Sequence, residues 1–172
     1  MKQHHFVNSL LQQATSEKKT IKKIIKVLKG KSKNELDMAF SIEHDNIFEN
    51  KIDCLECANC CKSLGPRLTD KDIDRLSKHL EMKPSEFTTR YLKVDEDGDY
   101  VFQKLPCPFL KNDNYCQLYE VRPKACREYP HTNRKRMHQI LDVTEKNARQ
   151  CPAVYLILKN LSLCAGRNMD VK

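Results

Sequence analysis

The chain has 172 residues, a formal net charge of +8 and a mean hydropathy of −0.68, which suits one small polar domain with an appendage. No segment is long and apolar enough to cross a bilayer, and the N-terminus shows no apolar secretory signal, so we expect a cytoplasmic protein. Nine cysteines in a compartment that keeps thiols reduced favour metal binding or catalysis over disulfide bonds.

Residues 1–50 contain no cysteine and are predicted to form a helical, lysine-rich arm. Apolar residues within 21–28 recur on one helical face, with lysines on the other, and Ser32 can cap a further helix. The basic run from Lys18 to Lys33 is nearly free of acidic residues. Such a run is typical of a solvated helix face, and it also suits an acidic protein or nucleic acid as partner.

Residues 51–164 are predicted to form the cysteine-rich domain, followed by a tail over residues 165–172. Thr69 and Asp72 have the spacing of a capping box, which predicts the start of a helix that runs to residue 82.

Short elements and turns follow in this domain. Proline at the first helical position and clusters of Asp, Asn and Gly at turns mark their boundaries. The expected elements are a helix from Pro84, strands over 91–94 and 100–103 joined by an acidic turn, a turn over 112–114, a helix after Pro123 and a last helix over 153–163. The predicted fold class is α+β: a small, helix-rich, metal-stabilised domain with short strands and an N-terminal helical arm.

Four cysteines fall within eight residues, at Cys54, Cys57, Cys60 and Cys61. A C-x2-C turn brings two thiolates within reach of one metal centre, and three cysteines at this spacing are typical of cubane iron–sulfur sites. The adjacent pair is harder to aim at one ion, since neighbouring side chains usually diverge. Two nearby centres, or a cluster plus a structural bond, would accommodate the pair better.

Four further cysteines complete a set of eight candidate metal ligands: Cys107, Cys116, Cys126 and Cys151. Eight thiolates suit two tetrathiolate zinc sites, or one four-iron cluster with four thiols left over. Cys164 lies beyond the last expected helix, and we do not expect it to be a ligand.

Four other side chains that are near the cysteines in the sequence could belong to the metal site. Arg122 and Arg127 flank Cys126, and a cationic group beside thiolates lowers their pKa and offsets the negative charge of a sulfur-rich centre. His131 and His138 follow in the sequence and could replace a cysteine as ligand, although no spacing supports either.

The cysteine pattern resembles the YkgJ-type cysteine-cluster family, a zinc- or iron-chelating domain. The residues that carry the resemblance are Cys54-x2-Cys57-x2-Cys60-Cys61, Cys107-Pro108-Phe109-Leu110, Cys116 with Arg122-Pro123-x2-Cys126-Arg127, and Cys151-Pro152. The resemblance spans residues 53–152 and implies that these cysteines chelate a metal. The implied cofactor is zinc or iron, with a [4Fe-4S] cluster as one form of the latter.

Three classes of function fit this sequence. The leading one is a metal-binding protein whose centre is structural, metal-handling or redox-active. The second is an iron–sulfur redox enzyme, or a component of a protein-modifying enzyme; the chain has no glycine-rich nucleotide loop, serine nucleophile motif or HExxH motif to support a particular reaction. The third is a zinc-stabilised module that binds acidic partners or nucleic acid through the basic arm.

Overall fold

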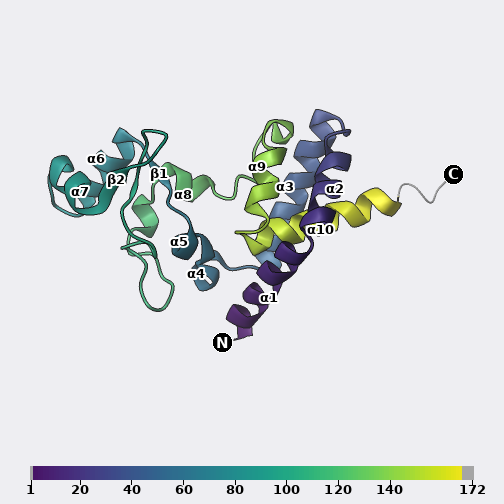
Figure 1. Cartoon of the computed structure of the whole chain (residues 1–172), viewed down its shortest axis with the longest axis horizontal. Coiled ribbons are helices and arrows are strands. Elements are labelled where there is room, and N and C mark those ends of the chain that lie inside the picture. Colours follow the sequence, from purple (N-terminus) through teal and green to yellow (C-terminus); the bar gives the residue numbers. More distant parts are fainter. Residues whose placement is uncertain (1, 168–172) are drawn as a thin grey trace. The chain divides into compact units, whose positions relative to one another are not determined.

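The computed structural model describes the backbone of residues 2–167 and the side chains of residues 5–163. The chain forms two compact units, which are described separately below (Figure 1). Unit 1 comprises Met1–Cys57 and Pro130–Lys172, and unit 2 comprises Ala58–Tyr129. The described part of the chain is rich in helix and holds one small antiparallel sheet, which confirms the predicted α+β class.

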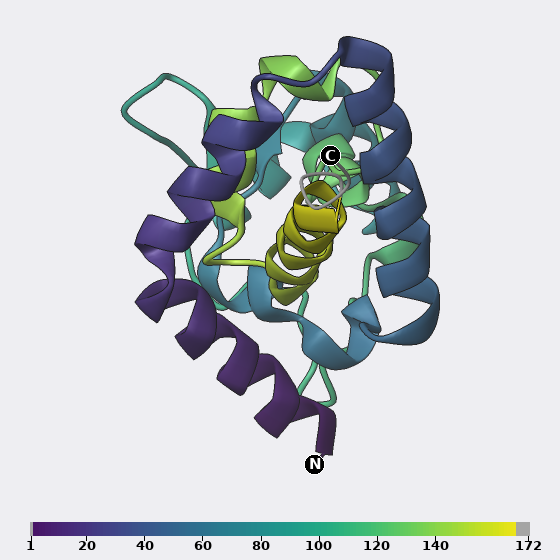
Figure 2. The ribbon, with the colours of Figure 1, turned by 90° about the vertical axis from the view of Figure 1, so that its right-hand side faces the viewer.

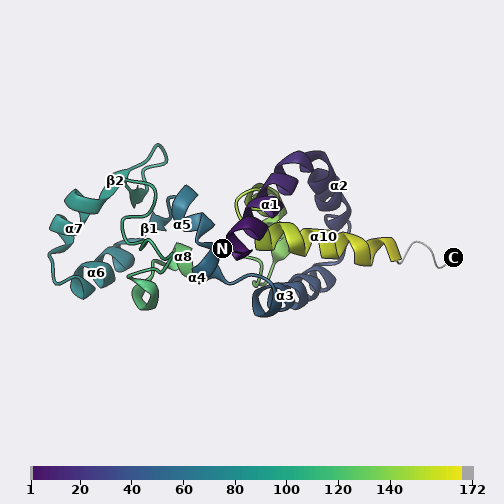
Figure 3. The same cartoon turned by 90° about the horizontal axis from the view of Figure 1, so that it is seen from below.

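Unit 1 is helical. Its elements are α1 (Lys2–Ser16), α2 (Lys18–Leu28), α3 (Lys33–Asn50), α4 (Cys54–Cys57), the 3₁₀ turn η2 (Met137–Gln139), α9 (Leu141–Asn147) and α10 (Pro152–Arg167). Helix α10 runs through the middle, with α1 and α2 on one side and α3 on the other (Figures 2 and 3).

The predicted amphipathic helices of the N-terminal region are confirmed. In α2 the apolar face is buried through Ile21, Ile24, Ile25 and Leu28, while its lysines are exposed. Ser32 caps α3, because its hydroxyl accepts a hydrogen bond from the backbone N–H of Glu35 at 3.3 Å.

Helix α10 forms the centre of the unit 1 core. Tyr155, Ile157 and Leu158 are fully buried, since helices cover α10 on more than one side. This explains the most apolar stretch of the sequence as a core helix. Among the residues described, no helix has the length and apolar character that spanning a membrane requires.

The division into units differs from the domain boundary expected near residue 50. Helices α1, α2 and α3 all contact α10, which the sequence analysis assigned to the cysteine-rich domain. The reason is physical: α10 is apolar on most of its surface, and the amphipathic N-terminal helices supply the apolar faces that cover it.

Unit 2 holds short elements around a small sheet. They are α5 (Asn59–Ser63), β1 (Arg67–Leu68), α6 (Asp70–His79), α7 (Pro84–Tyr91), β2 (Leu92–Val94), β3 (Tyr100–Phe102), the 3₁₀ turn η1 (Tyr119–Val121) and α8 (Lys124–Glu128). The strand order is β1-β3-β2, with both pairs antiparallel. Leu68 faces Tyr100 across one pair, and Leu92 faces Phe102 across the other.

The core of unit 2 is aromatic at its centre. Phe109 lies 4.9 Å from Tyr91, 5.7 Å from Phe102 and 6.4 Å from Phe87, measured between ring centroids. The cysteines Cys107 and Cys116 pack against this core, so the metal-site candidates and the apolar core share the same interior. Helix α6 starts with the predicted capping box of Thr69 and Asp72.

Candidate metal centre

None of the eight candidate cysteines, all of which lie within the described residues, forms a disulfide bond, and they divide between the two units. Unit 1 holds Cys54 and Cys57 on α4, and Cys151 immediately before α10. Unit 2 holds the other five: Cys60 and Cys61 on α5, Cys107, Cys116 and Cys126.

Backbone hydrogen bonds link the cysteine segments of unit 2 to one another. The N–H of Cys107 donates to the carbonyl of Cys61 at 2.8 Å, although 46 positions separate them in the sequence. Cys107 accepts in turn from the N–H of Leu110 at 3.0 Å, and Leu110 pairs with Cys116 across an isolated antiparallel bridge. Cys126 lies in the middle of α8, which packs against β1. Distant stretches of chain are therefore gathered around these thiols.

The sulfur atoms of Cys60 and Cys61 lie 4.0 Å apart on α5. Two thiolates of one tetrahedral zinc ion are about 3.8 Å apart, given a Zn–S distance of about 2.3 Å. The pair can therefore share an ion, in contrast to the divergence expected of adjacent side chains, because rotation about χ1 brings the two sulfurs together.

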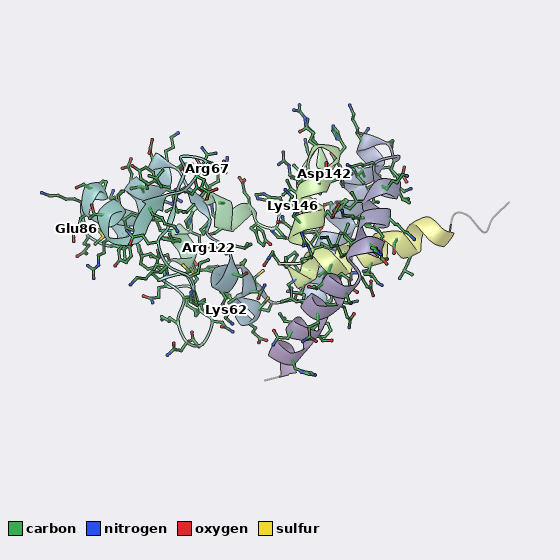
Figure 4. All side chains as sticks on the ribbon, in the orientation of Figure 1. Lys62, Arg67, Glu86, Arg122, Asp142 and Lys146 are labelled. Atoms are coloured by element: carbon green, nitrogen blue, oxygen red, sulfur yellow. The ribbon has the colours of Figure 1, made fainter. Side chains whose placement is uncertain are left out.

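Cys61 ionises more readily than an ordinary cysteine. A hydrogen bond with the Cys60 thiol lowers the pKa of Cys61 to about 7, burial opposes this, and the charges of Arg122 and Lys62 assist (Figure 4). A thiol with this pKa is about half thiolate near neutral pH, and the thiolate is the form that binds a metal.

Three further thiols of unit 2, those of Cys107, Cys116 and Cys126, resist ionisation. Burial raises the pKa of Cys107 to about 11 and that of Cys126 to about 12, and burial likewise raises the pKa of Cys116. Their mutual charges add to this effect: Cys61, Cys107 and Cys116 each raise the pKa of Cys126. The four thiols are thus close enough to repel one another as anions, and all four can be ionised together only beside a cation.

A second group of thiols occurs in unit 1. Cys151 is buried, and burial raises its pKa to about 12, with the charges of Cys54 and Cys57 contributing in the same direction. Hydrogen bonds from the backbone N–H groups of Val154 and Ala153, at the start of α10, act in the opposite direction. Cys151 therefore lies close enough to two other thiols to feel their charge, and backbone N–H groups offset part of the effect of burial on its pKa.

Arg122 provides a positive charge that acts on several thiols of unit 2. Its guanidinium carbon lies 3.6 Å from the centroid of the Tyr119 ring, and its charge lowers the pKa of Cys61, Cys116 and Cys126. Its Nε atom is buried and has no hydrogen-bond partner among the described residues. A buried donor with no acceptor and a positive charge that acts on three thiols fit an anionic centre, so the residues present suit a thiolate-bound metal.

The thiols are neighbours, and not a closed coordination shell. Within the described residues, no three His, Cys, Asp or Glu side chains are arranged to hold one metal ion. Of the other residues that the sequence suggested for the site, His138 is on η2, where its charge acts on Asp37, and Arg127 is exposed. Helix α10 continues to Arg167, so Cys164 belongs to the helix and not to a tail, and its side chain lies outside the described residues.

Three residues shape this site in ways that the sequence did not predict: Tyr119, whose hydroxyl could donate to sulfur, Asp72 and Arg75. Tyr119 supports the guanidinium of Arg122, and the other two bind the chain between Cys116 and Cys126. The only sequence signal for Asp72 was the capping box, which explains its role at α6 alone.

Thiols from separated segments of the chain lie close together in unit 2, and an arginine lies beside them. This arrangement is typical of a cysteine-rich metal-chelating domain. The chain belongs to the CxxCxxCC family, described as a "putative zinc- or iron-chelating domain", whose family model matches residues 53–152. No curated protein matches the chain, and no solved structure does.

Proposed function

We propose that the chain chelates zinc or iron through the thiolates of unit 2, with Cys61, Cys107, Cys116 and Cys126 as the ligands. The observation that carries this proposal is the mutual electrostatic effect of these four thiols together with the charge of Arg122. When bound, a divalent ion supplies the positive charge that lets four thiols ionise together.

The roles of the individual residues follow from their surroundings. Cys61 ionises first, because its pKa is about 7, and it offers the initial thiolate. Four thiolates around a divalent ion leave a net charge of −2, and Arg122 offsets part of it. Cys60, with its sulfur 4.0 Å from that of Cys61, extends the donor set of unit 2 to five thiols.

We further propose that Cys54, Cys57 and Cys151 contribute to a second thiolate site, in unit 1. Support comes from the effect of the first two cysteines on the pKa of Cys151 and from the N–H groups at the start of α10. The complete proposal therefore keeps all eight cysteines as ligands, now divided into two groups. It includes a cytoplasmic location, since that compartment keeps thiols reduced.

Both zinc and iron fit a set of cysteine thiolates, whether as single ions or, for iron, as a [4Fe-4S] cluster. The proposed role is structural, metal-handling or redox. Arg122 suits each of these roles, because a neighbouring positive charge favours a more negative centre.

The basic face of α2 supports a second candidate function, docking of an acidic partner. Five of its lysines are exposed: Lys18, Lys19, Lys22, Lys23 and Lys26. The nearest acidic groups are engaged elsewhere, since Glu17 pairs with Lys159 and Asp142 pairs with Lys29. Replacing these five lysines by Gln should leave metal content unchanged, and a salt-sensitive gel shift lost with them would identify nucleic acid as the partner.

Elemental analysis of anaerobically purified protein tests the main proposal. The wild-type protein should carry zinc or iron, Cys126→Ser should lose the metal of unit 2, and Cys151→Ser should lose the metal of unit 1. Full metal content in Cys126→Ser would contradict the assignment of the unit 2 ligands. A visible spectrum of the same samples distinguishes iron–sulfur from zinc.

A further inference from the structure

The side chain of Arg75 on α6 reaches the chain that connects two candidate ligands, Cys116 and Cys126. Its Nε donates to the carbonyl of Val121 at 3.2 Å, and its Nη2 donates to the carbonyl of Arg122 at 2.8 Å. These contacts span 46 and 47 positions of sequence. One planar guanidinium thus holds two successive carbonyl groups.

Asp72 binds the same segment of chain at Lys124, two residues after Arg122. Its Oδ1 accepts a hydrogen bond from the backbone N–H of Lys124 at 3.0 Å and another from Arg75 Nη2 at 2.5 Å. Its Oδ2 accepts from the N–H and the hydroxyl of Thr69, at 3.0 and 2.7 Å. The capping box alone needs only the contacts with Thr69, so two of the four donors to this buried carboxylate serve a different purpose.

Asp72 remains an anion over the whole physiological range of pH. Burial raises its pKa, but hydrogen bonds from Thr69, Arg75 and Lys124 outweigh burial and lower the pKa to about 2. The contacts with the turn are therefore charge-assisted and do not weaken between pH 5 and pH 8.

The turn that these two residues hold carries the groups most relevant to the centre. Arg122 lies within it, and Cys126 follows two residues after Lys124, on α8. Pro123 lies between the held positions and has a fixed backbone φ of −50°. Fixing the carbonyls of Val121 and Arg122 and the N–H of Lys124 leaves the backbone between Tyr119 and α8 little freedom.

We infer that Asp72 and Arg75 are positioning residues of the thiolate centre in unit 2, acting through the turn that carries Arg122 and leads to Cys126. The inference rests on the proposed function, since it assigns a role in metal retention to two residues that contact no metal ligand's side chain. A purely structural pair would be expected to stabilise α6, whereas three of the contacts go to the turn between the cysteines.

The test compares variants of α6 in protein loaded with zinc or with cobalt, the latter as a spectroscopic probe of thiolate coordination. Arg75→Met removes the guanidinium and with it the contacts to Asp72 and to the carbonyls of Val121 and Arg122. Arg75→Lys keeps the charge but cannot span two carbonyls and a carboxylate. Lys78→Met and Asp74→Asn are matched controls on the same helix, because both side chains are exposed. The readouts are the rate of metal release to a chelator, the cobalt absorption spectrum and hydrogen exchange of the Lys124 amide.

We expect Arg75→Met to release metal about 10- to 100-fold faster than the wild-type protein, as loss of an outer ligand-orienting contact does in metal sites. Its cobalt spectrum should change and its Lys124 amide should exchange faster. Arg75→Lys, which preserves the charge and the fold, should fall between wild type and Arg75→Met. The control variants should match the wild type.

Normal release rates and an unchanged cobalt spectrum in both Arg75 variants would overturn the inference, even if their melting temperatures fall. In that case the proposed function stands as long as Cys126→Ser still loses metal. A wild-type protein that binds neither zinc nor cobalt would instead overturn the proposed function, and the inference with it.

Discussion

Arg122 and Arg127 flank Cys126, yet their side chains have different surroundings. The guanidinium of Arg122 lies over the ring of Tyr119 and its charge acts on three thiols. Arg127, in contrast, is exposed and donates to the carbonyl of Arg122 at 2.9 Å. The sequence alone does not distinguish the two arginines, because both lie within four residues of Cys126. Only the structure distinguishes a charge beside the thiols from a contact with the backbone.

Arg122→Met should weaken metal binding in unit 2 by about 10- to 100-fold, because it removes the positive charge that compensates the thiolates. Arg127→Met should weaken binding much less, and it serves as the matched control. Competition with a chromophoric chelator measures both affinities. Equal effects of the two substitutions would show that proximity to Cys126 in sequence, and not the position of the charge, determines the contribution.

His44 in unit 1 is a residue whose protonation state affects folding. Its Nδ1 lies 2.8 Å from the hydroxyl of Thr132, which is fully buried, and its ring packs 4.5 Å from that of Phe48. Burial lowers the pKa of His44 from its usual 6.5, and the charge of Asp45 opposes that shift. The folded state therefore prefers the neutral ring.

A lowered histidine pKa means that the unfolded chain binds the proton more tightly. Unit 1 should accordingly be most stable above about pH 6.5 and should lose stability as the pH falls below that value. His44→Gln should reduce this dependence. Denaturant unfolding of α1, α3 and α10 at pH 7.5 and pH 5.5, followed by hydrogen exchange, measures it; an equally steep loss in His44→Gln would assign the effect to another group.

At the scale of the elements, the sequence predicted helices and turns that carry their own local signals. The capping box of Thr69, Pro84 at the start of α7 and the acidic turn between β2 and β3 are all confirmed. Asn114, in the predicted turn over 112–114, has a φ of 70°, which asparagine tolerates better than most residues.

Other elements have no comparable local signal. Helices α4 and α5 are only four and five residues long, too short for a helical period to be visible, and Ala58 between them has a φ of 46°. Strand β1 exists because Arg67 and Leu68 pair with β3, a contact over more than 30 residues. Such elements depend on tertiary partners, so local pattern cannot reveal them.

The aromatic core of unit 2 links its helices to the cysteine segments, since Phe109 packs between α7 and β3 two residues after Cys107. Phe109→Ala should lower the free energy of unfolding of unit 2 by about 3–5 kcal/mol, as large-to-small changes at buried aromatic positions do. Val94→Ala, at a residue 57% exposed, should change it by less than about 0.5 kcal/mol. Denaturant titration followed by hydrogen exchange of unit 2 amides gives both values, and a loss below 1 kcal/mol in Phe109→Ala would contradict this description of the core.

At the scale of the whole molecule, the sequence could predict which cysteines were candidates but not how they group. Spacing placed Cys54, Cys57 and Cys60 in one run, whereas Cys54 and Cys57 belong to the same unit as Cys151. Likewise, the hydrogen bond between Cys107 and Cys61 spans 46 positions. Groupings made by long-range contacts follow from the fold, which no local motif encodes.

Metal removal should affect the cysteine segments of unit 2 and the helical core of unit 1 differently. Under reducing conditions, a strong chelator should release the amides that join the cysteine segments of unit 2, notably those of Cys107 and Leu110, to fast exchange. Amides in the middle of α3 and α10 should stay protected, because apolar packing holds them. Unchanged protection at Cys107 after complete metal loss would show that the metal is not structural.

X-ray absorption spectroscopy at the zinc and iron edges, on anaerobically purified protein, tests the central claim most directly because it reports the bound element and its ligand atoms. We predict zinc or iron bound mainly by sulfur, with metal–sulfur distances of about 2.3 Å, and loss of sulfur ligands in Cys126→Ser. A metal surrounded only by oxygen and nitrogen at about 2.0–2.2 Å, or a spectrum that Cys126→Ser leaves unchanged, would contradict it.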